Sequence, residues 1–263
     1  MRELSFTDVS HSYVAVDGGV TRALDGLSLT VASGQSVAVI GPSGCGKSSM
    51  LQMAAGLLVP SEGTVAYDGA PLEGPRRETA LILQDFGLLP WKTVIGNAEL
   101  GLTVRKVPKA ERRDRARDAL RLVGLEGFED KYPGELSGGM RQRLALARSL
   151  ALDVDTLLMD EPLSALDALL REQLQETLLS LWRKEGYAQV LVTHSIEEAV
   201  YLGQRVYVLS PRPGRVVGVV ENPGMGSDGF RGSDEYASLV NEVRELLHGG
   251  SRPAEGEEVG AHA

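Results

Sequence analysis

GPSGCGKSS, residues 41–49, follows the apolar run SVAVI and precedes the helix-forming stretch MLQMAAGLL. The segment carries the spacing GxxxxGK[ST] on Gly41, Gly46, Lys47 and Ser48. Glycines let backbone N–H groups turn toward one centre, and the start of a helix adds the positive end of its dipole. A strand, this loop and a helix in that order predict a loop folded around phosphate rather than a flexible connection.

We expect this loop to bind the phosphates of a nucleotide. Lys47 would reach the β and γ phosphates, and the Ser48 hydroxyl would bind Mg²⁺. The predicted nucleotide-binding residues of the loop are Gly41, Pro42, Ser43, Gly44, Cys45, Gly46, Lys47, Ser48 and Ser49.

Apolar periodicity on both sides of the loop predicts an α/β fold. Residues 4–40 alternate as half-buried strands do, which predicts an N-terminal antiparallel β part. A helix is predicted over 48–58. Further strands are predicted at 64–69, 80–85, 155–160, 188–195 and, as a pair, 205–220, with helices at 168–186, 196–203 and 234–249. This order is typical of a core sheet of the P-loop NTPase kind.

The stretch 88–135 interrupts this core with charged helix formers and is predicted to be a helical subdomain insert. Its charge run is interpreted as a solvated helix face. The predicted nucleotide-binding core therefore comprises 1–87 and 136–221. A C-terminal helical extension is predicted over 222–248, and residues 249–263 have the composition of a disordered tail.

Composition excludes several classes of protein. Acidic residues outnumber basic ones by 36 to 27, which argues against a broad nucleic-acid-binding surface. The single cysteine, Cys45, cannot form an intrachain disulfide, so a reducing compartment is favoured and a small buried residue is expected. The chain starts without a signal-peptide pattern and lacks an apolar run of roughly 18 residues. We expect contact with a membrane only through a partner.

A second group of chemical residues follows the apolar strand LLMD. Taken alone, the pair Asp160 and Glu161 is typical of a helix cap or a turn. Beside a phosphate-binding loop, Asp160 would hold Mg²⁺ through water. Glu161 would then face the γ-phosphate and polarise an attacking water as a general base.

LSGGMRQRLALARSL, residues 136–150, resembles the signature motif of ABC-type ATPases, and it precedes TLLMDEP at the usual separation of that family. Gln84 resembles the Q-loop glutamine and His194 the switch histidine. The segment that resembles the D-loop consists of Ser164, Ala165, Leu166 and Asp167. The resemblance implies the ABC ATPase fold, ATP as the nucleotide, catalytic roles for Glu161, His194 and Gln84, and Mg²⁺ ligation by Ser48, Gln84 and Asp160.

The resemblance also implies a head-to-tail homodimer with ATP. Ser137, Gly138 and Gly139 stand at a predicted helix N-terminus, which is a second anion-binding position. In the family, the signature of one subunit closes over the ATP held by the other.

Tyr13, the histidines and Ser195 lie outside the motifs of the phosphate-binding loop and the signature. Tyr13 matches the family's aromatic that stacks on adenine, with a strand side chain buried against the sheet as the alternative. Of the histidines, His194 is interpreted as functional and the others, His11, His248 and His262, as structural. Ser195 departs from the family, in which most relatives have aspartate at this position.

Within ABC ATPases, QDFGLLPWKTV and YVLSPRPGRVV are similar to importer ATPases for nitrate, aliphatic sulfonates and taurine. This similarity implies a subunit at the cytoplasmic face of the membrane, bound to permease subunits that work with a substrate-binding protein. Trp91 is then either a packing residue or an anchor of the permease interface. The transported substrate does not follow from the sequence.

The alternative is a soluble ABC ATPase that acts in cofactor assembly or on nucleic acid. A DNA-acting relative usually carries a long coiled-coil insertion between the phosphate-binding loop and the signature. Only about 90 residues separate Lys47 from Ser137, which disfavours that alternative.

Overall fold

The computed structural model describes residues 3–250, so the tail from residue 251 on, including His262, lies outside the described residues. Two sheets are present, a six-stranded one in the order β10-β9-β3-β8-β7-β6 and a four-stranded one in the order β2-β1-β4-β5. The strands are β1 (Glu3–Val14), β2 (Val20–Ala32), β3 (Ser36–Ile40), β4 (Glu62–Tyr67), β5 (Ala70–Pro71), β6 (Thr79–Ile82), β7 (Thr156–Asp160), β8 (Ala188–Thr193), β9 (Arg205–Leu209) and β10 (Val216–Glu221).

The six-stranded sheet is parallel from β9 to β6 and gains one antiparallel edge strand, β10. Every residue of β3, β7 and β8 is buried, as expected where both faces of a parallel sheet are covered. Because these strands are parallel, their carboxyl ends meet at one edge, where ligands bind in such sheets. Ile40, Asp160 and Thr193 end the three strands at that edge.

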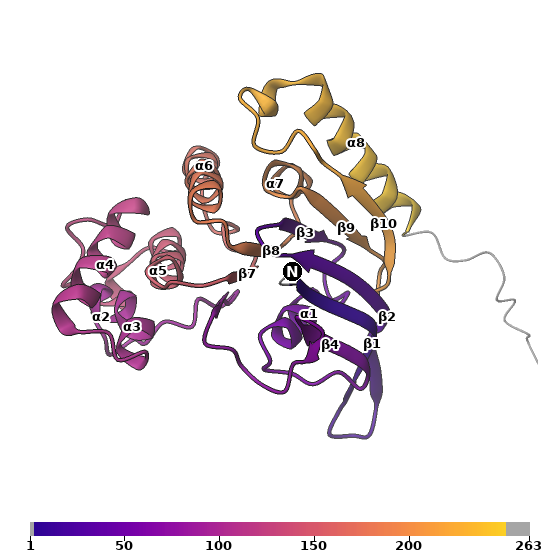
Figure 1. Ribbon diagram of the computed structural model, residues 1–263, viewed down its shortest axis with the longest axis horizontal. Helices are drawn as coiled ribbons and strands as arrows, with labels where there is room; N and C mark the ends of the chain where they lie inside the picture. The colour runs from indigo at the N-terminus through magenta and orange to yellow at the C-terminus, as the bar shows by residue number, and fades with distance from the viewer. Residues whose placement is uncertain (1–2, 251–263) are drawn as a thin grey trace, which may run out of the picture.

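The four-stranded sheet confirms the antiparallel β part that the N-terminal alternation predicts. Its inner side chains, such as Leu4 and Phe6, share a core with Val37 and Val190 of the larger sheet. Helix α1 (Lys47–Ala54) contributes Met50 to the same core. In Figure 1, β1, β2 and β4 lie on the right, beside α1. This shared core holds β3 and α1, the two elements that the phosphate-binding loop connects.

A group of helices occupies the opposite side of the molecule (Figure 1). It contains α2 (Val94–Ala98), α3 (Leu100–Val104), α4 (Lys109–Leu122) and α5 (Gly138–Leu150). Helix α4 buries only Ala116, Ala119 and Leu120, so its charge run is solvated as interpreted. Between β6 and α2 the chain is a loop, and the first helix within the predicted insert of residues 88–135 begins at Val94.

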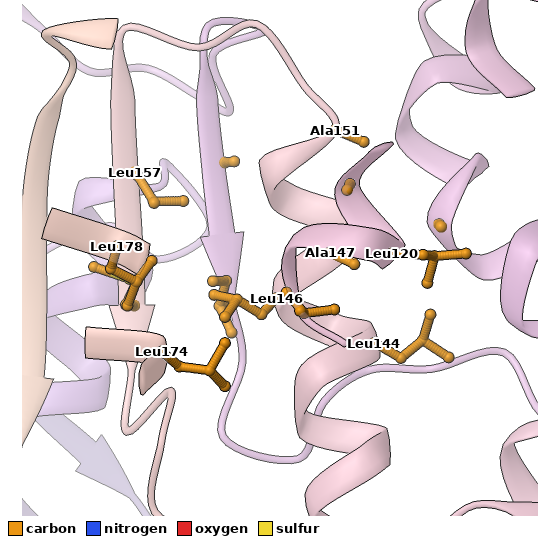
Figure 2. Close-up of a cluster of buried hydrophobic side chains, with 14 of the residues drawn as sticks. Leu120, Leu144, Leu146, Ala147, Ala151, Leu157, Leu174 and Leu178 are labelled. Carbon is orange, nitrogen blue, oxygen red and sulfur yellow. The ribbon is translucent and has the colours of Figure 1, made fainter. Parts of the chain in front are cut away.

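Helix α5 connects this group to the core. Figure 2 shows Leu144 of α5 beside Leu120 of α4, while Leu146 points toward Leu174 and Leu178 of α6 (Ala168–Glu185). Leu120, Leu144 and Leu146 are at most 1% exposed. Each buried leucine contributes about 2 kcal/mol of hydrophobic free energy. The helix that carries the signature is therefore held on two faces.

The C-terminal part packs on the other edge of the six-stranded sheet. Helices α7 (Ile196–Leu202) and α8 (Asp234–Gly249) share a core with β9 and β10. Short 3-10 turns stand at Pro133–Glu135 and Phe230–Gly232. Within residues 3–250, no helix is both long and apolar enough to cross a lipid bilayer.

Candidate nucleotide site

The phosphate-binding loop joins the end of β3 to the start of α1, as predicted. Gly44 and Gly46 have φ angles of 76° and 96°, in the left-handed region that glycine adopts most readily. A Cβ on Gly46 would lie 2.6 Å from Leu24 Cδ2, so the fold also leaves no room for a side chain there. Lys47 is buried, and its Nζ donates to the carbonyls of Gly41 at 2.7 Å and Pro42 at 2.9 Å.

Not every residue of the loop presents its side chain to this site. Cys45 is fully buried in the core, and burial raises the pKa of its thiol. Gly41 and Pro42 supply carbonyls to Lys47. Helix α1 starts without an acidic residue in its first turn and without a side-chain cap, so its positive end faces the loop uncompensated.

A pocket of about 450 Å³ lies at the loop. It is lined by Tyr13, Thr21, Ala23, Ser43, Gly44, Gly46, Lys47, Ser48, Ser49, Gln84, Glu161 and Arg212. Six of these residues belong to the predicted phosphate-binding loop, and Tyr13, Gln84 and Glu161 were also predicted for the site. Arg212 adds a cation that was not predicted for the site.

Tyr13 lines this pocket and is 45% exposed, so it is not buried against the sheet. Its hydroxyl forms a hydrogen bond with Ser49 Oγ at 2.8 Å, and its ring meets His11 edge to face with centroids 4.7 Å apart. His11 itself is buried and lies 3.3 Å from Ser61 Oγ through Nδ1, which fits a structural histidine. The exposed tyrosine ring fits the predicted contact with a base.

Asp160 and Ser48, two predicted magnesium ligands, are already in contact. Burial raises the pKa of Asp160, while its hydrogen bond with Ser48 and the charge of Lys47 oppose that rise. Among residues 3–250, no three His, Cys, Asp or Glu side chains gather into a metal site. A hydroxyl and one carboxylate fit a hard cation that also takes phosphate and water oxygens as ligands.

Glu161 contacts both other predicted catalytic residues. Gln84 Nε2 donates to its Oε2 at 3.4 Å, and His194 Nδ1 lies 3.3 Å from its Oε1. The backbone of Glu161 has a φ of 48°, which is uncommon for a residue with a side chain and costs about 1 kcal/mol or more. Its N–H donates to the carbonyl of Val192 at 2.9 Å, which holds the turn.

The signature and D-loop residues lie outside the lining of this pocket in the described part of the chain. Ser137 is exposed and caps α5, where its Oγ accepts from Met140 N at 3.3 Å. Asp167 caps α6 by accepting from Leu170 N at 3.0 Å. A Cβ on Gly139 would lie 3.2 Å from Leu166 Cδ2, so the two motifs are packed together.

Gln142 connects these motifs and was not predicted. It is 2% exposed. Its Nε2 donates to the Glu161 carbonyl at 3.0 Å, and its Oε1 accepts from Ala165 N at 2.9 Å. The amide side chain of Gln142 therefore connects the signature helix to the turn of Glu161 and to the D-loop. The signal in the sequence is a polar residue on a helix face made mostly of leucine and alanine.

The loop that carries Gln84 is attached to the same helix. Arg148 of α5 donates through Nη2 to the carbonyl of Phe86 at 2.7 Å and through Nη1 to that of Gly87 at 2.6 Å. Burial lowers the pKa of Arg148. Trp91, further along this loop, is 71% exposed, so it is not a buried packing residue.

Ser195, the position at which this chain departs from the family, has a structural role at the start of a helix. It is the N-cap of α7, and its Oγ accepts from Glu198 N at 3.2 Å. A serine and an aspartate perform this capping equally well. The departure from the family therefore leaves the start of α7 capped.

We predict that Ser195→Ala costs about 1 kcal/mol of unfolding free energy because the cap is lost. In a chain of this size the loss lowers the midpoint of thermal unfolding by roughly 2–4 °C. Ser195→Asp should keep the midpoint, and so should Ser180→Ala, which changes an exposed serine within α6. An unchanged midpoint for Ser195→Ala, measured by circular dichroism, would contradict the capping role.

The comparison with protein families identifies one match. The family model described as ABC transporter matches residues 24–164, which span the phosphate-binding loop, the signature and the D-loop serine. Among curated proteins, the taurine import ATP-binding protein TauB of Burkholderia pseudomallei strain 1710b is 50% identical over 217 residues, 82% of this chain and 83% of that protein. The protein of the same name from Rhizobium johnstonii is 45% identical and covers 90% of this chain and 93% of its own length.

Solved structures agree with this assignment. The dimeric structure of MJ0796, a bacterial ABC transporter cassette, is similar with a TM-score of 0.78 and 32% identity, over 84% of this chain and 100% of that one. A second structure, of the same cassette in a post-hydrolysis state bound to ADP and Pi, is similar to the same degree. The chain belongs to the ABC transporter family and is an ATP-hydrolysing subunit with the ABC ATPase fold.

Proposed function

We propose that this chain is the ATP-hydrolysing subunit of an importer that powers uptake of a small organic or inorganic ion, such as taurine, a sulfonate or nitrate, through a separate permease. The observation that carries the proposal is the contact of Glu161 with Gln84 and His194 beside the pocket of Lys47. Relatives named as taurine import ATP-binding proteins support the importer role.

The residues that line the pocket suit ATP. Tyr13 would stack on adenine, and the loop N–H groups with Lys47 would bind the phosphates. Ser48, Gln84 and Asp160 would hold Mg²⁺, which would neutralise charge on the β and γ phosphates. Lys47 would exchange its carbonyl partners, Gly41 and Pro42, for phosphate oxygens.

Glu161 would act as the general base of hydrolysis. It would take a proton from a water while the water oxygen attacks the γ-phosphorus and the bond from that phosphorus to the bridging oxygen of ADP breaks. His194, which lies beside the Glu161 carboxylate, would contact the γ-phosphate. The hydrogen bond from Gln84 would orient Glu161. It would also couple the nucleotide state of the site to the position of the loop that carries Gln84.

We propose that two copies of the chain form a head-to-tail homodimer. In this dimer, the signature of one subunit closes over the nucleotide of the other through Ser137, Gly138 and Gly139. The core of residues 1–87 and 136–221 would bind ATP, and the insert of residues 88–135 would meet the permease at the cytoplasmic face of the membrane. Residues 222–248 would form the C-terminal extension. The exposed Trp91 fits an anchor of the permease interface.

Gln84→Ala provides a test of this proposal. We expect ATP affinity to change by less than about threefold, because the phosphates are held by the loop of Lys47. Substrate-stimulated ATP turnover of the reconstituted importer should fall at least about tenfold, since Gln84 connects Glu161 to the loop that Arg148 attaches to α5. The measurements are nucleotide titration of the isolated chain and substrate-stimulated ATP turnover of the importer in proteoliposomes.

Gln173→Ala, at an exposed position of α6, is the matched control and should leave both quantities unchanged. If Gln84→Ala binds ATP tenfold more weakly while its coupling to the permease is intact, the role of Gln84 in transmission is wrong.

A further inference from the structure

The segment SPRPGR, residues 210–215, connects β9 to β10 and lies directly on the phosphate-binding loop. A Cβ on Gly214 would stand 2.0 Å from the carbonyl oxygen of Cys45. The N–H of Gly214 donates to the carbonyl of Ala23 at 2.9 Å, and its carbonyl accepts from Asp25 N at 3.1 Å. The backbone of this segment is therefore in contact with both the phosphate-binding loop and β2 beside the pocket.

This segment is held rigidly by its own hydrogen bonds. Ser210 Oγ donates to the carbonyl of Pro213 at 2.9 Å and accepts from Arg215 N at 3.0 Å. Arg215 Nε donates to Asp25 Oδ2 at 2.6 Å. A side chain that projects from this segment consequently has a defined position relative to the loop.

Arg212 is that side chain. Its Nε donates to the carbonyl of Gly44 at 2.9 Å, and the residue lines the pocket beside Ser43, Gly44 and Lys47. A Cβ on Gly44 would lie 2.7 Å from Arg212 Nη2, so the glycine leaves room for the guanidinium. Within residues 3–250, Arg212 forms no ion pair with a carboxylate, whereas Arg215 pairs with Asp25. An arginine without a counter-ion beside a phosphate site is well suited to bind phosphate oxygens.

We propose that Arg212 is a nucleotide-binding residue. Its Nε stays on the Gly44 carbonyl, and its terminal N–H groups bind the polyphosphate of the nucleotide next to Lys47. The inference rests on the nucleotide site proposed above and adds to it a second cation, supplied by the β9–β10 connection. The competing explanation is that Arg212 only braces the loop through Gly44.

The test is titration of the full chain with ATP, ADP and AMP in the presence of Mg²⁺. Loss of a hydrogen bond to a charged group weakens binding roughly tenfold or more, so Arg212→Gln should raise the Kd of ATP and ADP by at least that factor. The Kd of AMP, which lacks the β and γ phosphates, should change by less than about threefold. Arg212→Lys should recover part of the affinity, because it restores the charge but not the planar fork.

Arg117→Gln is the control, since it removes an exposed arginine of α4 that neither lines the pocket nor belongs to the segment of Arg212. It should leave the Kd of all three nucleotides near that of the parent. Parent affinity for ATP in Arg212→Gln would overturn the inference. An equal loss of affinity for ATP, ADP and AMP together with a lower unfolding midpoint would also overturn it. That result would show that Arg212 only stabilises the loop through Gly44.

Lys47→Ala separates this inference from the proposed site itself. If Lys47→Ala loses ATP binding while Arg212→Gln does not, only the role of Arg212 is wrong. If Lys47→Ala also keeps parent affinity, the nucleotide does not bind at this loop, and both proposals fail.

Discussion

Glu161→Gln is expected to bind ATP as the parent does and to hydrolyse it roughly 10² to 10⁴ times more slowly, because a positioned general base is lost. The amide keeps the shape of the side chain and can still accept the hydrogen bond from Gln84. The substitution also removes a negative charge next to the proposed position of the γ-phosphate. ATP with Mg²⁺ should therefore hold two chains in a long-lived dimer that size-exclusion chromatography separates from the monomer.

Two variants serve as comparisons for this result. Asp160→Asn should weaken Mg²⁺-dependent nucleotide binding and form no stable dimer, since its carboxylate pairs with Ser48 at the proposed metal position. Glu197→Gln, an exposed change in the first turn of α7, should turn over ATP at the parent rate. If Glu161→Gln hydrolyses ATP as fast as the parent, another group such as His194 must activate the water.

Much of this site was predictable because it depends on local rules. The spacing from Gly41 to Lys47 reflects the backbone of one short loop, Asp160 ends a buried strand and His194 follows one. Once a parallel sheet is predicted, residues that follow its strands are expected at one edge. The structure accordingly brings Glu161 into contact with His194, although they are 33 positions apart in the chain.

The residues that were missed depend on contacts between distant segments. Arg212 meets Gly44 across 168 positions, and Arg148 meets Phe86 across 62. Neither contact leaves a periodic or compositional signal. Helix α1 also ends at Ala54, four residues before the predicted end. Gly56 turns the chain with a φ of 71°, and a Cβ there would lie 2.2 Å from the carbonyl oxygen of Gly74. Apolar periodicity does not indicate where such a turn ends a helix.

Ser137→Arg is expected to abolish ATP hydrolysis while the loop of Lys47 still binds ATP. A large cation at the start of α5 would block the approach of the signature to the nucleotide of the partner subunit. The side chain is exposed, so the change requires no rearrangement of the core. ATP turnover should fall at least about a hundredfold, as expected when docking that completes the site is lost.

Ser233→Arg is the matched control for this variant. Ser233 caps α8, as Ser137 caps α5, and its Oγ accepts from Tyr236 N at 3.1 Å. Both variants lose a helix cap and gain an arginine, but only one of them changes the signature. Ser233→Arg should keep ATP turnover and lower the unfolding midpoint by a few degrees, since a lost cap costs about 1 kcal/mol. Loss of turnover in both variants would point to a general effect of the lost cap.

A mixed dimer decides whether the signature acts on its own chain or on the partner. In a dimer of Ser137→Arg with Lys47→Ala, a head-to-tail arrangement gives one site with both defects and one site with an intact loop and an intact signature. Each variant alone gives two defective sites, so mixing the two inactive proteins should restore ATP turnover and occlude one ATP per dimer. If the signature acted within its own chain, both sites of the mixed dimer would be defective. A mixture as inactive as its components would therefore contradict the head-to-tail arrangement.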